Sequence, residues 1–554
     1  MIDRRHFIGG ATALATAPAF AATGQGGLDM ALVNGDFWTG HGLPNGPRPR
    51  ALGIIGGRIA ALGDAAVRAR ITRRTQVIDL DGAFALPAFA DGHTHFLKGA
   101  VALSQPDLLQ ARSQAEFTAL VAAAVRKAPG QWLLGGAWDE QRMGGQLPTR
   151  AWLDAVSPDT PIALPRTDLH SLLLNSVALR LAGITRDTPD PDGGMILRDA
   201  QGEPTGVLKD NAKALVLRII PAPSEAETDA ALRAGIAHGL SKGFAQIHNP
   251  EIDWTVLPAL RRLRAAGETD LRFYCFVPIH DWARLVEIIK ADGRGDDWVR
   301  WGGVKALADG SLGARTAAFF GDYADAPGQK GLWVTPPDEL RELVRAADAH
   351  GLHVATHAIG DRANATVLDI YAEVARAHGP RDRRFRIEHA QHMRLADIPR
   401  FRAQNVIASV QPFHAIDDGR WAVKRIGEAR LAGTYAFRSF FEAGVKMAFG
   451  SDWPVAPLDP FVGIAAAVLR ETIDGANPHG WQPQQRVSVE QALKAYTQGN
   501  AYAAFMDDRA GLLAPGYYAD ITVLDRDLTA VRPEEILATK VLKTIVNGRL
   551  RYEG

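Results

Sequence analysis

The sequence predicts an α/β protein with parallel strand–helix units, arranged as a barrel or as a doubly wound sheet, between two β-rich chain ends. Three observations predict this class. In the centre, short apolar runs alternate with amphipathic segments at helical spacing. At both ends, short apolar runs meet turn dipeptides. The 554 residues, 47% of them hydrophobic and 22% charged, are enough to form a large core.

The composition excludes several classes of protein. Lys and Arg together number 62, as do Asp and Glu, so the formal net charge is zero. Without a basic excess to neutralise phosphates, nucleic acid is not an expected partner. The single cysteine, Cys275, cannot form an internal disulfide. Its place in the apolar run 271–277 predicts a buried, inert thiol rather than a nucleophile.

The first residues have the pattern of an export signal. Paired arginines at 4–5 precede a short Gly-, Ala- and Thr-rich apolar segment, and residues 19–21 form an A-x-A cleavage pattern. We expect residues 1–21 to be a twin-arginine signal peptide and the twin-arginine export machinery to be a partner. The mature protein is then expected in the periplasm without stable membrane insertion. A retained membrane anchor is the alternative, but the apolar part is short for a bilayer span.

Short apolar runs with turn signals mark both ends of the chain. Asn34-Gly35 follows the first run and Gly56-Gly57 separates two others, and such dipeptides predict hairpins. The apolar runs lie at residues 30–33, 52–55, 59–62, 520–524 and 544–549. The simplest arrangement is one small β domain built from both chain ends.

The central segment alternates strands and helices with a period of roughly 30–50 residues, which favours parallel βα units. No G-x-G-x-x-G follows an early strand, which weakens a dinucleotide-binding interpretation. Expected helices lie at residues 337–350, 362–378 and 395–404, and expected strands at 304–307, 352–356, 385–388 and 406–410. The expected domains are a small β domain from residues 22–86 and 509–554 and a central domain at 87–508.

Two histidines at the end of an early apolar segment carry the most information. His93 and His95 form an H-x-H pair in the segment 86–95. In an extended strand, residues i and i+2 point to the same side, so both imidazoles can reach one ion. Barrel active sites lie at the carboxyl ends of the strands, which favours a metal site over the alternative of a polar surface pair.

Further residues with ligand chemistry lie in or at the ends of later predicted strands. They are Lys305, His357, His389 and Asp452. Alone, each has an ordinary explanation, such as a solvated loop histidine, an N-capping aspartate or a surface lysine. Because they are in register with predicted strands downstream of the H-x-H pair, together they indicate one site.

The stretch between His95 and Lys305 is longer than the three βα units that it must contain. We therefore expect an insertion at about residues 105–215. Within it, His170 and Trp138 are candidates for the substrate pocket. The alternatives are that Trp138 is a packing residue and that His170 is a satisfied core residue.

Several motifs together resemble the amidohydrolase superfamily, and more narrowly amidohydrolase family 3, the YtcJ-like and N-substituted formamide deformylase-like group. The similarity runs from about residue 28 to the C-terminus. The matching motifs lie at residues 86–95, 166–170, 304–313, 357–363, 386–392 and 450–455. The resemblance implies a distorted (β/α)₈ TIM barrel with an inserted segment and a small composite β-sandwich domain.

The resemblance also implies a site for one or two divalent metal ions. His93 and His95 would hold one ion, and His357 and His389 the other. Lys305 would bridge the two ions only if CO₂ had carboxylated its N6 atom, because an ammonium group cannot ligate a cation.

The mechanism we expect uses a divalent ion, with Zn²⁺ the best match to nitrogen and oxygen ligands. Asp452 would touch the metal, take a proton from the attacking water and deliver it to the departing nitrogen. The expected activity is hydrolysis of a non-peptide C–N bond, in an amide, formamide or cyclic amide of a small molecule. Alternatives are a C–O hydrolase such as a lactonase, or a non-catalytic periplasmic metal- or solute-binding protein. A homo-oligomer is left open.

Overall fold

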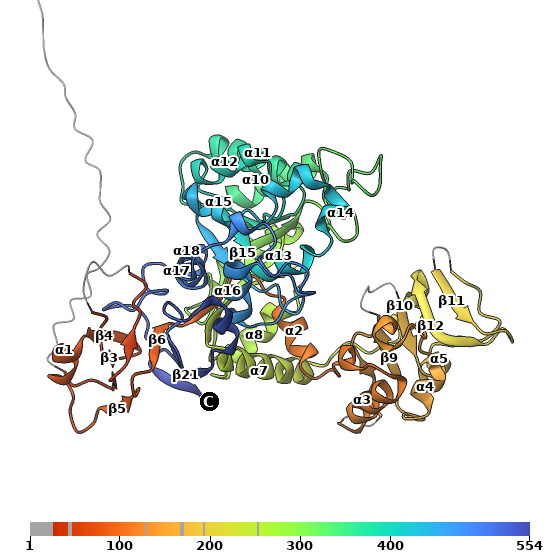
Figure 1. Cartoon of the computed structure of the whole chain (residues 1–554), viewed down its shortest axis with the longest axis horizontal. Coiled ribbons are helices and arrows are strands. Elements are labelled where there is room, and N and C mark those ends of the chain that lie inside the picture. Colours follow the sequence, from red (N-terminus) through yellow and green to blue (C-terminus); the bar gives the residue numbers. More distant parts are fainter. Residues whose placement is uncertain (1–25, 42–46, 128–129, 167–170, 192–193, 252–253) are drawn as a thin grey trace, which may run out of the picture.

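The computed structural model describes residues 26–41, 47–127, 130–166, 171–191, 194–251 and 254–554. The expected signal peptide at 1–21 and the candidate His170 lie outside these residues. The chain forms a barrel surrounded by helices, a β-sandwich built from both chain ends, and a separate lobe whose sequence is inserted between the first and second barrel strands (Figure 1).

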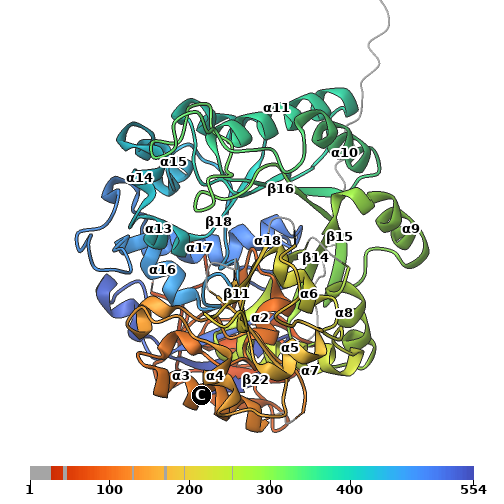
Figure 2. The ribbon, with the colours of Figure 1, turned by 90° about the vertical axis from the view of Figure 1, so that its right-hand side faces the viewer.

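Eight parallel strands form the barrel sheet, and their order in the sheet follows the chain. They are β7 (Phe89–Asp91), β13 (Phe244–Pro250), β14 (Arg272–Pro278), β15 (Val299–Leu307), β16 (His353–Ala358), β17 (Arg386–His389), β18 (Ile407–Val410) and β19 (Met447–Phe449). Nearly all of their residues are buried, as expected for parallel strands covered by helices. Figure 2 shows β14, β15, β16 and β18 around a common centre with helices outside them.

Hydrogen bonds between the first and last strands, and between the loops that follow them, bring the two edges of the sheet together. They run from Gly92 N–H to Phe449 O (2.9 Å), from Asp452 N–H to His93 O (2.7 Å) and from His95 N–H to Trp453 O (2.8 Å). Gly450 permits this close approach, because a Cβ atom there would lie 2.5 Å from the backbone nitrogen of His93. The expected distorted barrel is confirmed.

Helices cover the outside of the barrel. The main ones are α7 (Glu225–Ser241), α8 (Val256–Ala265), α9 (Trp282–Asp292), α10 (Pro337–Ala349), α11 (Asp361–His378), α12 (Ile398–Ala403) and α16 (Pro460–Leu469). Others are α2 (Phe96–Ala102), α13 (Pro412–Asp418), α14 (Ala422–Ile426), α15 (Phe437–Glu442), α17 (Val489–Lys494) and α18 (Asn500–Ala503). The helices expected at 337–350 and 362–378 are confirmed to within a residue. The one expected at 395–404 is a 3₁₀ turn followed by α12.

The sandwich combines segments from both chain ends, as expected. One sheet holds β1 (Met30–Val33), β3 (Leu52–Ile55), β4 (Arg58–Leu62) and β5 (Gln76–Asp79). The other holds β2 (Asp36–Phe37), β6 (Phe84–Pro87), β20 (Ile521–Leu524), β21 (Val541–Val546) and β22 (Arg549–Glu553). A shared core that includes Leu32, Phe37, Ile54 and Ile521 joins the two sheets.

One hairpin prediction is wrong. Gly56-Gly57 does connect the antiparallel pair β3 and β4, but Asn34-Gly35 carries the chain from β1 in one sheet to β2 in the other. Asn34 adopts a positive φ of 55°, and Gly35 donates its N–H to Arg50 O. The dipeptide therefore makes the tight turn that its residues favour, yet the strands it joins do not pair.

The inserted lobe has its own five-stranded sheet. Its elements are α3 (Gln114–Lys127), β8 (Leu133–Leu134), α4 (Arg150–Asp154), β9 (Ile162–Pro165), β10 (Ser171–Leu174), α5 (Ser176–Leu181), β11 (Gly194–Arg198), β12 (Pro204–Asp210) and α6 (Ala214–Leu217). Two apolar clusters fill it, and neither includes a barrel residue. Figure 1 shows the lobe in orange and yellow, set apart from the barrel. Across the described part of the chain, no helix is long and apolar enough to cross a bilayer.

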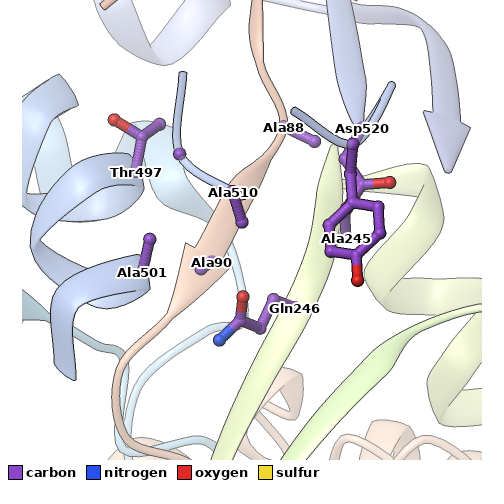
Figure 3. Close-up of a pocket in the computed structure, with 10 residues that line it drawn as sticks. Ala88, Ala90, Ala245, Gln246, Thr497, Ala501, Ala510 and Asp520 are labelled. Atoms are coloured by element: carbon purple, nitrogen blue, oxygen red, sulfur yellow. The ribbon is translucent and has the colours of Figure 1, made fainter. Parts of the chain in front are cut away.

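The end of the barrel that faces the sandwich is closed. A small cavity of about 20 Å³ lies at this end, near the start of the strands β7 and β13. Figure 3 shows that alanines make up much of its lining, with Gln246, Thr497 and Asp520 as polar neighbours. This volume suits a single water molecule, so a substrate must bind elsewhere.

Candidate metal centre

The six residues predicted as metal ligands lie at the opposite end of the barrel, where the strands end. His93 and His95 follow β7, Lys305 lies in β15, His357 in β16, His389 ends β17, and Asp452 follows β19. These are the first, fourth, fifth, sixth and eighth strands of the barrel. The fold therefore places residues from distant parts of the chain around one opening.

The H-x-H pair and Asp452 form a group of converging donors. The Nε2 atoms of His93 and His95 lie 3.6 and 3.4 Å from Asp452 Oδ1. Within the described structure, His93 Nε2 and Asp452 Oδ1 are buried and make no hydrogen bond. Burying unpaired polar atoms is costly, and a cation held between these nitrogens and the carboxylate would satisfy them. The donor set thus fits a divalent metal ion.

A second group of donors shares the same carboxylate. His389, His414 and Asp452 offer ligand atoms that all lie within 4.8 Å of one another, as do His93, His95 and Asp452. His414 Nε2 is buried, lies 3.8 Å from Asp452 Oδ2 and has no hydrogen-bond partner among the described residues. Asp452 therefore stands between two sets of imidazoles, with one oxygen toward each.

Each of the four predicted histidine ligands uses one ring nitrogen to donate a hydrogen bond to the protein. The bonds are His93 Nδ1 to Glu388 Oε2 (2.5 Å), His95 Nδ1 to Glu251 Oε2 (3.1 Å), His389 Nδ1 to Gln411 Oε1 (2.7 Å) and His357 Nε2 to the Gly310 carbonyl (3.1 Å). In each ring the second nitrogen is thereby available to bind a metal. Such outer hydrogen bonds fix the tautomer and orientation of metal-binding histidines.

Glu388 is itself fixed by hydrogen bonds from a buried arginine. Arg386 donates to both carboxylate oxygens, from Nε at 2.7 Å and from Nη2 at 3.0 Å. It also donates to Gly92 O and Ser409 Oγ. Burial acts to raise the pKa of Glu388, but the positive charges of Arg386 and Lys305 outweigh it and hold this pKa below its usual range. Glu388 is therefore an ionised acceptor for the His93 ring.

The buried imidazoles are neutral at physiological pH. Burial, with the nearby charge of Lys305, lowers the pKa of His357 to about 4. Burial likewise holds the pKa values of His93 and His389 well below their ordinary range. Burial also lowers the pKa of Lys305. Neutral imidazole is the form that binds a metal.

The backbone at the site is strained. Asp452 and His389 have φ values of 61° and 71°, in the left-handed region that non-glycine residues rarely adopt. The buried Asp91 holds the loops in place, because its carboxylate accepts hydrogen bonds from the backbone N–H groups of His93 and Ser451, each at 3.0 Å. Strain of this kind is concentrated at functional sites.

A cavity of about 400 Å³ opens above these donors. Its lining combines predicted ligands, including Lys305, His357 and His389, with an apolar and acidic outer wall. The outer wall holds Leu307, Leu312, Ile359, Asp417, Asp418, Trp421 and Val455. The volume lies in the range of small-molecule sites.

The structure does not bring Trp138 to this cavity. Its side chain is fully buried in the core of the inserted lobe, near Phe117 and Trp152. The indole Nε1–H donates to the Leu164 carbonyl at 2.9 Å, so both its apolar surface and its polar atom are satisfied within the lobe. In this arrangement Trp138 is a packing residue, which is the alternative that the sequence left open.

Sequence reasoning missed several residues around the site. His414 follows the seventh strand. This strand lies between those that carry His389 and Asp452, and no site residue was predicted for it. The absence of a candidate on that strand was the signal that could have led to His414. Glu388 precedes His389 directly and shares a strand face with Arg386, but a buried acidic residue next to a ligand has no sequence signature of its own. Glu251 comes from the loop after the second strand, and only the fold reveals its proximity to His95.

Comparison with known proteins shows to which family the chain belongs. The model of a family described as "Amidohydrolase family" matches residues 76–552, which is most of the chain. The chain belongs to the amidohydrolase family. The site described above therefore lies in an amidohydrolase barrel, and family and geometry together support a metal-dependent hydrolase.

Three relatives illustrate the similarity. "Protein LONG AFTER FAR-RED 3" of Arabidopsis thaliana is 37% identical over 95% of this chain and 91% of its own length. "Putative amidohydrolase YtcJ" of Bacillus subtilis is 34% identical over 86% of this chain and 91% of its own. "N-substituted formamide deformylase" of Arthrobacter pascens is 28% identical over 91% of this chain and 95% of its own.

A solved structure supports the fold. The crystal structure of an uncharacterized metal-dependent hydrolase from Pyrococcus furiosus is 31% identical and superposes with a TM-score of 0.76. The match covers 90% of this chain and 99% of that chain. The amidohydrolase family expected from the sequence is confirmed.

Proposed function

We propose that this amidohydrolase cleaves a non-peptide C–N bond of a small molecule, in an amide, a formamide or a cyclic amide. The observation that carries the proposal is the convergence of unpartnered imidazole nitrogens and the Asp452 carboxylate at the base of a small-molecule cavity. The similarity to a relative named N-substituted formamide deformylase supports the C–N bond and an acyl group as small as formyl.

The metal we propose is Zn²⁺, as one ion or two. His93, His95 and Asp452 would hold one ion, because their free atoms converge. His357 and His389 would contribute to a second. A set of imidazoles and a carboxylate matches zinc chemistry. When bound, such an ion supplies a Lewis acid that polarises a carbonyl and lowers the pKa of a bound water molecule.

The protein's own residues handle the proton and the substrate. Asp452 lies at the junction of the two donor groups, so its carboxylate can accept a proton from the attacking water and pass it to the leaving nitrogen. One C–O bond forms at the acyl carbon and one C–N bond breaks, giving a carboxylic acid and an amine. The neutral histidines with fixed tautomers keep the donors in place throughout.

We propose that Lys305 acts as a ligand only in the N6-carboxylated form. The side chain is buried and lines the cavity beside His357 and His389. An unmodified ammonium group has no lone pair for a metal, whereas a carbamate offers two oxygens. Intact-mass measurement and an electron-density map around Lys305, both at high bicarbonate, test this directly.

The experiment that tests the proposed function is a substrate panel with zinc-loaded protein. We expect hydrolysis of N-formyl amines or small cyclic amides, with formate or the ring-opened acid detected by mass spectrometry. The same panel includes lactones. Turnover of lactones alone would replace the C–N assignment by C–O hydrolysis, and no turnover of any member would favour a binding protein.

We also propose export to the periplasm by the twin-arginine route. The paired arginines at 4–5 and the A-x-A pattern at 19–21 support it. Replacing both arginines by lysine in the full chain should retain the precursor in the cytoplasm of a bacterial host, as measured by fractionation and immunoblotting. Unchanged export would contradict the proposal.

A further inference from the structure

The outer wall of the cavity carries a second feature that the hydrolytic centre does not use. The helix α13 lines the cavity with His414 and Asp418, which are four residues apart and so lie on one helix face. Four residues correspond to a rise of about 6 Å along the helix axis. Because His414 lies beside Asp452, Asp418 stands one helical turn away from the reacting centre.

The carboxylate of Asp418 is fixed in place but is not neutralised. Its Oδ2 accepts hydrogen bonds from the Tyr435 hydroxyl at 2.6 Å and from Gln391 Nε2 at 2.8 Å. Both donors are neutral. Within the described chain, no donor reaches Oδ1 and no cationic side chain forms an ion pair with Asp418. The neighbouring Asp417, in contrast, is paired with Arg420.

The titratable groups nearest to Asp418 in the remainder of the cavity are His414, which acts to lower the pKa of Asp418, and Asp417, which acts to raise it. The only lysine or arginine in the described lining is Lys305, which lies at the metal end. Apolar side chains, among them Leu307, Leu312 and Ile359, line the wall. Burial raises the pKa of Asp418 to about 6, so the group is still mostly ionised at neutral pH. Burying an ionised carboxylate is costly unless a cation pairs with it in addition to its hydrogen bonds.

We propose that Asp418 binds a positively charged nitrogen of the substrate. The substrate class is then an N-acylated amine that carries a second, protonated amine, separated from the acyl group by a short hydrocarbon spacer. This inference rests on the proposed function and specifies its substrate. It also excludes N-acyl amino acids whose carboxylate would lie at the same position, because like charges repel there.

Three compounds of similar shape test the proposal. N-formyl-1,4-diaminobutane is cationic, N-formylpentylamine replaces the ammonium group by methyl, and N-formyl-5-aminopentanoate replaces it by carboxylate. A charge-assisted hydrogen bond in a partly buried site predicts that kcat/KM for the cation exceeds that for the neutral compound by roughly 10- to 100-fold. The anionic compound should be the poorest. Equal or better turnover of the neutral or anionic compound would overturn the proposal.

Substitution of Asp418 provides a second test of the proposal. Asp418→Asn should abolish most of the preference for the cation while it changes kcat/KM for the neutral compound by less than about threefold. Asp417→Asn removes a charge that Arg420 already neutralises, so it should change selectivity much less. Asp292→Asn, in an exposed pair with Arg261 on the barrel exterior, is the matched control. An equal loss on all three compounds in Asp418→Asn would contradict a role in recognition.

Binding measurements separate this inference from the proposed function. If the zinc-loaded protein hydrolyses none of the three compounds, the hydrolytic assignment for formamides fails. Calorimetric titration with the same compounds then tests Asp418 alone. Tighter binding of the cation by wild type than by Asp418→Asn supports the cation subsite, and identical binding by both proteins overturns it.

Discussion

The two ends of the barrel differ in whether their buried polar atoms have hydrogen-bond partners. At the closed end, Arg272 donates to both oxygens of Asp520, at 2.8 and 3.2 Å, and its guanidinium lies 3.9 Å from the centre of the Tyr518 ring. At the open end, His93 Nε2 and Asp452 Oδ1 are also buried but have no hydrogen-bond partner in the described structure.

This difference shows which end is built for stability and which for chemistry. The closed end holds the Arg272–Asp520 pair beside a cavity of about 20 Å³, whereas the open end holds, in front of the Arg386–Glu388 pair, buried atoms without hydrogen bonds beneath about 400 Å³. Unpaired buried polar groups and a strained backbone lower stability, and a protein retains them where a ligand uses them. Residues at the open end should therefore control activity, and residues at the closed end should control folding.

The largest expected effect lies at the open end. Asp452→Asn removes the group that accepts and returns the proton, so kcat should fall by roughly 10²- to 10⁴-fold. Zinc content should stay close to that of wild type, because an amide oxygen can still approach the ion. Steady-state kinetics and metal analysis of the same sample measure both quantities. Full activity in this variant would refute the catalytic role.

At the closed end, Arg272→Met should lower the free energy of unfolding by about 3–5 kcal/mol, because it removes the cation that pairs with the largely buried carboxylate of Asp520 and leaves that carboxylate with the Asn547 N–H as a donor. The kcat of the folded fraction should be unchanged. Chemical denaturation followed by circular dichroism gives the first quantity. Arg261→Met, which breaks an exposed pair with Asp292, should cost no more than about 1 kcal/mol. A similar cost for both variants would remove the distinction between the two ends.

Loss of a hydrogen bond that orients a metal-ligating histidine should have an intermediate effect, on the affinity for Zn²⁺. Glu388→Gln weakens the hydrogen bond that orients His93, so the Kd for Zn²⁺ should rise by roughly 10- to 100-fold. Competition with a chromophoric chelator measures this Kd. Glu339→Gln, an exposed partner of His280 on the barrel exterior, is the control. An unchanged Kd in Glu388→Gln would show that the ring needs no such support.

The smallest effect is expected in the inserted lobe. Trp138→Phe deletes the indole hydrogen bond to Leu164 O and should lower the free energy of unfolding by about 1–2 kcal/mol. Scanning calorimetry measures the change. The kcat/KM should stay at the wild-type value, since Trp138 does not line the cavity. A selective rise in KM would instead place Trp138 in the substrate pocket.

Much of this architecture could be predicted from the sequence because the signals are local. Alternation of apolar runs and amphipathic helices predicted β16, β17 and β18 nearly to the residue, and each predicted ligand falls at the end of a barrel strand. The Asn34-Gly35 prediction failed because a turn dipeptide specifies a turn but not which strands then pair.

The remainder depends on contacts between distant residues. Glu388 is separated from His93 by 295 positions in the chain, and the local sequence around neither residue predicts their contact. His414 shares the cavity with Asp452 only because the barrel closes. The pairing state of Asp418 is likewise set by Gln391 and Tyr435, which come from separate loops. Burial and missing partners, which mark the functional end most clearly, exist only in the folded chain.

A metal centre at the open end of the barrel is tested by titrating metal-free protein with Zn²⁺, for wild type and for His93→Ala, by isothermal calorimetry. We expect tight, stoichiometric binding by wild type and the loss of at least one ion from the variant, with the fold retained. Absence of tight binding by wild type, or the same stoichiometry and affinity in His93→Ala, would contradict a metal centre at the open end of the barrel.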